Sequence, residues 1–440
     1  MYSKNLLGLL KEKGIGIGDR IKVVSGSGEF EGLLMPRPLV GDPDIIVIKL
    51  DNGYNTGLIP ISVSLVEKNP AHHQAPKDEE EGKEHAKGGV AILGCGGTIA
   101  SKIEYKTGAV YPSITPRELR MAFPALRKWD IHSRQLFSLF SEDMNAHHWK
   151  LLADAIEEEI KHGSEGVVVM HGTDTMTYTA AAMSFMLQNL PVPVVLVGSQ
   201  RSSDRPSSEN EMNLLNAVFS ATRDLGEVAV CMHADSSDDV CHLHRGTRVR
   251  KNHTSKRAAF KSMNSLPLFR VDYRTRLFEA ISPSKPRHEG GLVAKKSVNA
   301  NVAMIYSHPN IKPEFISKLD DYDGIVLVGT GLGHVSVNAL EDKSVKGILK
   351  PLKGLIDSGI PVVMSSQCLS GRICMRVYST GRLLMEAGVI GDGADWTPEA
   401  AYVKLCWALG QTKKMDEVKR LMMSDIAGEI SERSALEELR

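Results

Sequence analysis

The stretch VVVMHGTDTMTYTA, residues 167–180, decides the fold. Four apolar residues, 167–170, run directly into HGTDT, and a run of small residues compatible with a helix begins at Met176. This pattern predicts a buried strand, a tight turn and the start of a helix. In an open α/β sheet such a junction lies at the carboxyl edge, where ligands bind. Thr173, Asp174 and Thr175 could also serve only to cap the helix, so both interpretations stay open for this stretch alone.

From residue 88 onward, predicted strands and helices alternate. Further strands are expected at 90–93, 192–197 and 227–233, and helices at 116–123, 146–162, 176–190 and 209–222. Alternation of this kind implies a mainly parallel sheet covered by helices. A second α/β block has expected strands at 303–306, 324–328 and 361–364, with amphipathic helices over 397–440. Because a stretch rich in Pro and Lys interrupts the rhythm at 282–301, we expect two α/β domains, 88–285 and 300–440.

The first 68 residues have a different pattern, typical of a small all-β domain. Short strands are expected at 19–24, 30–35 and 45–50, and Asp51-Asn52-Gly53 is a strong hairpin signal. Several short strands in so few residues favour an SH3-like β-barrel. Such a barrel could hold a partner or could cap the main domain. The polar residues 69–87 (NPAHHQAPKDEEEGKEHAK) are typical of a linker.

Composition narrows the class of protein. The 440 residues are 42% hydrophobic and 24% charged with a formal net charge of zero, so no bulk basic field points to nucleic acid. Six scattered cysteines without a CxxC pair indicate reduced thiols and a cytoplasmic location. No apolar run reaches the roughly 18 residues that cross a bilayer, so we expect no membrane segment.

A glycine-rich loop, GCGGTIAS at 94–101, follows the first strand of the main domain. It lacks the Lys-Ser/Thr ending of a phosphate-binding loop, and Ile99 stands where a dinucleotide fingerprint requires glycine. Its glycines would let backbone N–H groups approach a substrate closely, beside the Thr98 hydroxyl. Backbone donors next to a hydroxyl are what acyl transfer with an oxyanion site requires.

A threonine nucleophile needs a nearby base or a strong local field. Asp174 could supply a carboxylate, and a partly buried Lys251, within RGTRVRKN at 245–252, could act as the base. The sequence does not bring Lys251 to Thr173, and a surface charge is the alternative. The residues at 231–244 are rich in Cys, His and Asp but lack zinc spacings, which favours a polar loop over a metal site.

Two threonine motifs together resemble the paired signature of the asparaginase/glutaminase family: GGTIA at 96–100 and HGTDTM at 171–176. Residues 245–251 and AFKS at 259–262 resemble that family's lysine segment, and SEDM at 141–144 resembles its substrate loop. The resemblance runs from about residue 88 to residue 410. A barrel and linker before this core are similar to the D subunits of archaeal Glu-tRNA(Gln) amidotransferases. The fold implied is an asparaginase-like two-domain α/β core with mainly parallel sheets, preceded by the small SH3-like β-barrel.

The resemblance implies roles for individual residues. Thr98 is the expected nucleophile, which forms an acyl-enzyme, while Asp174 and Lys251 support Thr173 as an activating network. Asp174 also holds the substrate ammonium. Tyr105 is expected to close over Thr98, with Tyr111 as its rival.

The resemblance also implies a substrate pocket without a metal. Ser141 and Glu142 would bind the α-carboxylate and α-amino groups, beside Gly97 and Gly172. In this family the sites lie at a dimer interface, to which residues 329–334 could contribute from across it.

The activity implied is glutamine hydrolysis that supplies ammonia to a second subunit, E, which binds tRNA and converts Glu-tRNA(Gln) to Gln-tRNA(Gln). ATP and magnesium would belong to that partner, and this chain would need no cofactor. The expected assembly is a heterotetramer containing a homodimer of this chain. A free-standing L-asparaginase, which needs the same pocket but no barrel, is the alternative.

Overall fold

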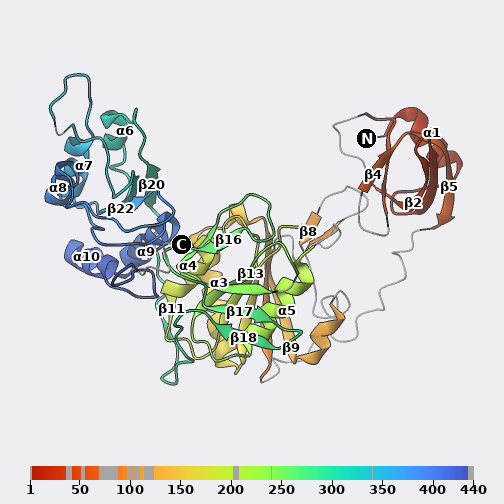
Figure 1. The fold of residues 1–440 in the computed structure, drawn as a ribbon, viewed down its shortest axis with the longest axis horizontal. Coiled ribbons are helices and arrows are strands. Elements are labelled where there is room, and N and C mark those ends of the chain that lie inside the picture. The colour runs from red at the N-terminus through yellow and green to blue at the C-terminus, as the bar shows by residue number, and fades with distance from the viewer. Residues whose placement is uncertain are drawn as a thin grey trace.

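A computed structural model describes residues 2–35, 42–50, 55–68, 88–96, 101–103, 110–112, 123–201, 208–238, 240–338 and 340–434. Its largest sheet has the strand order β18-β17-β14-β13-β12-β10-β6-β9 (Figure 1). Five strands run parallel: β6 (Val90–Gly96), β9 (Ile131–Leu139), β10 (Gly166–Met170), β12 (Val194–Val197) and β13 (Val228–His233). Antiparallel strands β14 (Cys241–Arg245), β17 (Phe269–Asp272) and β18 (Leu277–Ala280) extend one edge.

Strand β10 is apolar along its whole length because both faces of the sheet are covered. Val167 and Val169 face a core formed with α3 (Ala146–Lys161) and α4 (Met176–Met186). Val168 and Met170 face a second core formed with α5 (Asn210–Ala221) and the short helix η2 (Pro124–Lys128). A parallel strand buried on both faces has this continuous apolar run, so the predicted strand, turn and helix at 167–180 are confirmed.

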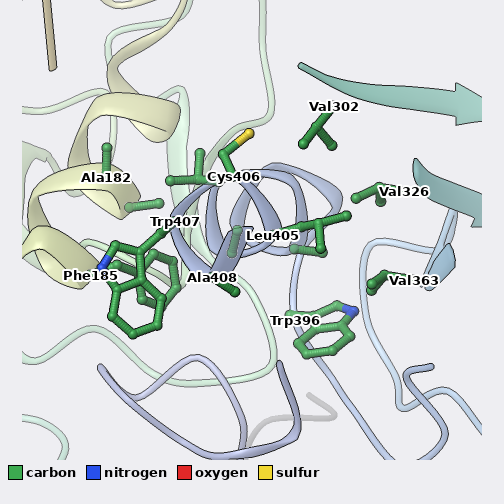
Figure 2. Close-up of a cluster of buried hydrophobic side chains, with 14 of the residues drawn as sticks. Ala182, Phe185, Val302, Val326, Val363, Trp396, Leu405, Cys406, Trp407 and Ala408 are labelled. Atoms are coloured by element: carbon green, nitrogen blue, oxygen red, sulfur yellow. The ribbon is translucent and has the colours of Figure 1, made fainter. Parts of the chain in front are cut away.

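The C-terminal part of the chain forms a second, three-stranded parallel sheet, β20-β21-β22. It contains β20 (Val302–Tyr306), β21 (Gly324–Gly329) and β22 (Val362–Ser366), with helices α6 (Pro313–Ser317), α7 (Leu349–Asp357), α8 (Ser379–Glu386), α9 (Pro398–Gln411) and α10 (Met415–Met423) (Figure 1). Helix α9 joins the two sheets: Trp407 stacks on Phe185 of α4 at 6.0 Å, and Leu405 lies toward the second sheet (Figure 2).

The N-terminal part is a five-stranded antiparallel sheet with the order β4-β3-β2-β1-β5 (Figure 1). Helix α1 (Lys4–Glu12) precedes β1 (Arg20–Ser25), β2 (Gly28–Leu34), β3 (Ile46–Lys49), β4 (Asn55–Leu58) and β5 (Pro60–Glu67). Alternate residues of β1 and β3 are buried in its own small core, as a half-exposed strand requires. The predicted hairpin turn at 51–53 and the linker at 69–87 lie outside the described residues.

Three expectations need correction. The helix expected over 176–190 ends at Met186, because β11 (Leu187–Gln188) pairs with β19 (Val293–Ala294). Helix α9 is not amphipathic: it is buried on nearly every side between the two sheets, which an all-round apolar helix permits. After Met423 the chain forms turns up to residue 434 instead of continuing as helix. The helix expected at 116–123 falls largely outside the described residues.

None of the helices within the described ranges combines the length and the apolar character that crossing a bilayer requires.

Candidate active site

The strands that precede the two threonine motifs, β6 and β10, are parallel neighbours in the main sheet. Gly94 of β6 pairs with Met170 of β10, so Gly96, the last residue of β6, and His171, the first residue after β10, lie at the same edge of this sheet. Residues 97–100, with Gly97 and Thr98, lie outside the described part of the chain, and so does Tyr105. Tyr111 belongs to β8 (Val110–Pro112), which pairs with β7 (Ser101–Ile103). The roles of Thr98 and of the two tyrosines therefore stay predictions.

Lys251 reaches the HGTDT turn from a short hairpin. It ends β15 (Val249–Lys251), which pairs with β16 (Phe260–Ser262). Its Nζ lies 2.9 Å from Thr173 Oγ1 and 2.7 Å from Asp174 Oδ1. The Lys251 side chain is only 13% exposed, so it is not a surface charge. Lys251 therefore meets two adjacent residues, Thr173 and Asp174, that lie 78 and 77 positions before it in the sequence.

The donor and acceptor roles in these hydrogen bonds determine where the Thr173 hydroxyl proton can go. Thr173 Oγ1 accepts from Lys251, so the hydroxyl proton of Thr173 points elsewhere and can be passed to another group. Thr173 is buried, whereas the Asp174 side chain is 67% exposed. The Thr173 end of this hydrogen-bonded set is thus shielded from solvent, while the Asp174 carboxylate is open to solution.

The predicted substrate loop touches the same turn. Ser141 begins the short helix η3 (Ser141–Asp143) and is buried, while Glu142 is exposed. A Cβ on Gly172 would lie 2.8 Å from Ser141 Cβ and 2.9 Å from Ser141 Oγ, so only glycine lets this loop come so close.

Thr175 makes a contact with the substrate loop that the sequence did not predict. It is the N-cap residue of α4, yet its side chain makes no capping bond. Instead its Oγ1 donates to the carbonyl of Ser141 at 2.5 Å. A hydroxyl two positions beyond Thr173 thus fixes the loop expected to hold substrate, and Thr175 occupies the N-cap position of α4 without making a side-chain capping bond.

The buried side chain of His171 links the HGTDT turn to helix α4 through hydrogen bonds. Its ring is fully buried, with Nδ1 2.6 Å from the carbonyl of Gly172 and Nε2 2.9 Å from Thr179 Oγ1. Since a carbonyl only accepts, Nδ1 carries the proton and Nε2 accepts from the threonine. Burial lowers the pKa of His171 to about 4. A neutral imidazole therefore ties β10 to α4 at neutral pH.

The residues rich in Cys, His and Asp at 231–244 form a hydrogen-bonded cluster. Cys241 Sγ and His233 Nδ1 both donate to Asn213 Oδ1, at 3.3 and 2.6 Å. Asn213 Nδ2 in turn donates to the carbonyl of Gly198 at 3.0 Å, and a Cβ on Gly198 would lie 3.0 Å from Thr173 Cγ2. This cluster therefore fixes the backbone at Gly198, which packs against Thr173. Over the part of the chain that is described, no group of three or more His, Cys, Asp or Glu side chains is arranged to hold a metal ion.

Residues 329–334 begin at the last residue of β21 in the second sheet, and Thr330 and His334 form an isolated bridge just after it. Their contribution across a dimer interface stays a prediction.

Comparison with known families covers most of the chain. Residues 89–282 match the "Asparaginase, N-terminal" model, residues 301–422 the "Glutaminase/Asparaginase C-terminal domain" model, and residues 15–67 the "GatD N-terminal domain" model. Among solved structures, the thermostable L-asparaginase from Thermococcus kodakarensis is similar, with a TM-score of 0.70 and 31% identity. The match covers 78% of this chain and 99% of that one. The asparaginase-like core predicted from the two threonine motifs is thus confirmed.

Full-length relatives share the N-terminal part as well. The D subunit of the glutamyl-tRNA(Gln) amidotransferase of Pyrococcus furiosus is 43% identical over 432 residues, which is 96% of each chain. The protein of the same name from Methanobrevibacter smithii is 42% identical over 97% of each chain. The chain therefore belongs to the family of glutamyl-tRNA(Gln) amidotransferase D subunits, whose core has the asparaginase fold.

Proposed function

We propose that this chain hydrolyses glutamine and delivers the ammonia to a partner that converts Glu-tRNA(Gln) to Gln-tRNA(Gln). The contact of Lys251 Nζ with both Thr173 Oγ1 and Asp174 Oδ1 carries this proposal. It is an assembled proton-transfer set at the carboxyl edge of a parallel sheet, where ligands bind. The relatives named above support the tRNA-dependent role.

The reaction proceeds in two steps through an ester. The Thr98 hydroxyl attacks the amide carbon of glutamine, its proton passes to the leaving nitrogen, and ammonia departs. Water then attacks the glutamyl ester and releases glutamate. Thr173, held by Lys251, relays protons in these steps, and Asp174 receives the substrate ammonium on its exposed oxygen. Ser141 and Glu142 bind the α-carboxylate and α-amino groups, Gly97 and Gly172 complete the substrate site, and Tyr105 closes over Thr98.

The partner supplies what this chain lacks for amide formation. The E subunit binds tRNA, ATP and magnesium and activates the glutamate, while this chain contributes a homodimer to a heterotetramer. The β-barrel formed by α1 and β1–β5 holds that partner, and no organic cofactor or metal is needed on this chain. All six cysteines are free thiols, which suits a reducing cytoplasm.

Dependence on the partner is the first testable prediction. The purified chain alone is expected to hydrolyse glutamine slowly, and its rate to rise when the partner and glutamyl-tRNA are added. Ammonia release is measured with glutamine and with asparagine, which differ by one methylene and so by about 1–3 kcal/mol in a fitted pocket. Rapid asparagine hydrolysis by the isolated chain, unchanged by the partner, would favour a free-standing L-asparaginase instead.

A further inference from the structure

The strand that carries Lys251 has two different faces. Side chains alternate along a strand, and here Val249 and Lys251 face the first sheet domain, where Val249 is fully buried in the core with α4. The flanking Arg248 and Arg250 face the C-terminal part of the chain, where they pair with Asp395 and Glu399. The strand that carries Lys251 is therefore stabilised, on the face opposite Lys251, by ion pairs with the C-terminal domain that contains β20–β22.

Arg248 is the buried residue on the side of the strand that contacts the C-terminal part of the chain. Its guanidinium donates to both the backbone and the side chain of Asp395, from Nη1 to the carbonyl at 3.1 Å and from Nη2 to Oδ1 at 3.2 Å. It also donates from Nε to the carbonyl of Gly428 at 2.7 Å and from Nη2 to Ser431 Oγ at 2.7 Å. The side chains of Arg248 and Asp395 are 2% and 1% exposed. A planar guanidinium group that donates to this many acceptors is held in one orientation.

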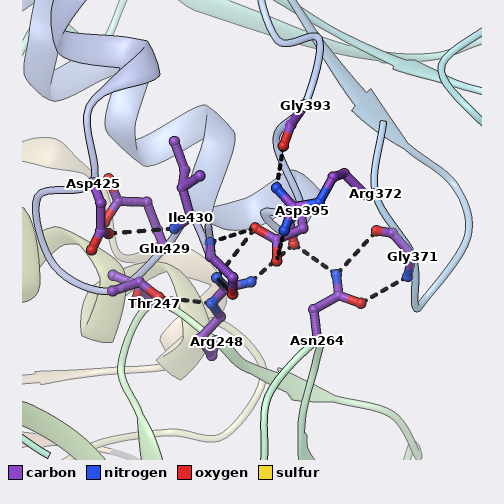
Figure 3. A network of polar contacts seen from close by, with 12 residues as sticks. Thr247, Arg248, Asn264, Gly371, Arg372, Gly393, Asp395, Asp425, Glu429 and Ile430 are labelled. Atoms are coloured by element: carbon purple, nitrogen blue, oxygen red, sulfur yellow. Dashed lines mark hydrogen bonds and ion pairs between the residues drawn. The ribbon is translucent and has the colours of Figure 1, made fainter. Parts of the chain in front are cut away.

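Asp395 also holds the other strand of the hairpin. Asn264, just beyond β16, donates from Nδ2 to the carbonyl of Asp395 at 2.6 Å, the same oxygen that Arg248 uses. Asn264 Oδ1 in turn accepts from the backbone N–H of Gly371 at 2.7 Å (Figure 3). One residue of the second domain thus fixes both ends of the β15–β16 hairpin.

A lysine side chain needs such a frame to act reproducibly. It is a flexible four-carbon stem with a compact charge, and here it must stay within about 3 Å of two acceptors at once. Beyond Lys251 the hairpin continues into an exposed segment at 252–256. Holding reactive groups within a fraction of an ångström depends on the residues behind them.

We propose that Arg248 is a positioning residue. Through Asp395 it sets the backbone of β15 so that the Lys251 ammonium contacts Thr173. It thereby couples packing of the domain with the main sheet against the domain with β20–β22 to glutamine hydrolysis. This inference rests on the role proposed above for Lys251. The competing view is that Arg248 and Asp395 only stabilise the interface between the domains. The two views differ in what happens to turnover when the fold is intact.

The test compares Arg248→Met with Glu159→Gln in the full complex. Glu159 is a buried carboxylate on α3 that lies 2.8 Å from His132 Nε2 and 3.8 Å from the Arg134 guanidinium, and it serves as a matched loss of a buried charged group on another element. Arg248→Met is expected to lower kcat about 10²-fold with KM for glutamine changed less than about threefold. Glu159→Gln is expected to shift the unfolding midpoint but to leave kcat near the wild-type value. Equal kcat values for the two variants, both folded, would overturn the proposal.

A double-variant comparison separates positioning from general damage. In a Lys251→Met background, Arg248→Met should cause no further loss of kcat, because the group that it positions is gone. A further loss of the same factor as in the wild-type background would overturn the proposal. Arg248→Lys, which keeps the charge but not the fork, is expected to recover only part of the rate; full recovery would contradict a geometric role.

Two further outcomes are distinguishable. If Arg248→Met does not fold, Asn264→Ala removes the other anchor of the hairpin and is expected to lower kcat about tenfold, again with KM little changed; an unchanged kcat would overturn the proposal. If Lys251→Met itself keeps the wild-type rate, the proposed function of the site fails, and the inference fails with it for that separate reason.

Discussion

Replacing Thr173 with alanine is expected to lower kcat for glutamine hydrolysis about 10³-fold, the range in which a positioned proton-transfer group contributes. The variant loses the hydroxyl that Lys251 Nζ binds at 2.9 Å, and with it the route by which a proton reaches or leaves the substrate. A 10³-fold loss corresponds to about 4 kcal/mol of transition-state stabilisation. Ammonia release by the full complex measures it, with the circular dichroism of each variant as the check on folding.

A neighbouring threonine provides the control. Thr177 is also buried and lies on α4, so Thr177→Ala deletes the same atoms near the same place and is expected to keep kcat within a few-fold. Residues that act as a unit are not additive, so Thr173→Ala combined with Lys251→Met should lose no more than the worse single variant. Near-normal turnover in Thr173→Ala would remove Thr173 from the essential set.

Replacing Lys404 with methionine is expected to cost about 3–5 kcal/mol of stability, the usual cost of stranding one partner of a buried ion pair. Lys404 on α9 and Glu429 are both fully buried, with Nζ 2.5 Å from Oε1. The ammonium also donates to the carbonyls of Met422 and Ser424 at the end of α10. The variant therefore leaves a buried carboxylate and two carbonyls without their donor. Urea unfolding followed by tryptophan fluorescence measures the loss.

The loss should depend on pH with a defined sign. Burial alone would raise the pKa of the Glu429 carboxyl, but Lys404 and the backbone N–H groups of Ile426 and Ala427 bring it below its usual range. A depressed carboxyl pKa stabilises the fold above the unfolded-state value, and this stability is lost as the pH falls. The difference between wild type and Lys404→Met is therefore expected to be largest at pH 7 and to shrink as Glu429 takes up a proton.

Two variants test this reasoning. Lys353→Met breaks an exposed pair with Asp357 at 2.9 Å and is expected to change stability by less than about 1 kcal/mol. Adding Glu429→Gln to Lys404→Met removes the stranded charge and should recover much of the loss. If Lys404→Met unfolds at the same urea concentration as Lys353→Met, the buried pair does not stabilise the C-terminal part of the chain.

Local pattern was enough to predict the strand, turn and helix that carry Thr173 and Asp174, but not the β15–β16 hairpin that carries Lys251. The strand, turn and helix at 167–180 follow from burial of β10 on both faces, and β10 lies parallel to β6, the strand that precedes the first threonine motif. What the sequence could not supply were contacts between distant residues. Lys251 meets Thr173 because the β15–β16 hairpin folds back over the sheet edge, and Arg248 finds Asp395 147 positions later.

Other misses have equally specific causes. Thr175 has the residue type and position of a helix cap, and only the approach of Ser141 gives its hydroxyl a different acceptor. Helix α9 was expected to be amphipathic, and its charged residues include Lys404 and Glu399. In the fold Lys404 is buried against Glu429, and the buried Glu399 pairs with Arg250. Charged residues that find buried partners look the same in sequence as those that face water.

The measurement that tests the central claim most directly is the identity of the residue that attacks glutamine. The complex is treated with a glutamine analogue whose amide is replaced by an electrophilic diazoketone, digested with trypsin and analysed by mass spectrometry. A nucleophilic Thr98 predicts the adduct in the peptide spanning residues 88–102, on Thr98, with loss of activity in step with labelling. An adduct on Thr173, in the peptide spanning residues 162–201, or complete inactivation without label on either threonine, would contradict it.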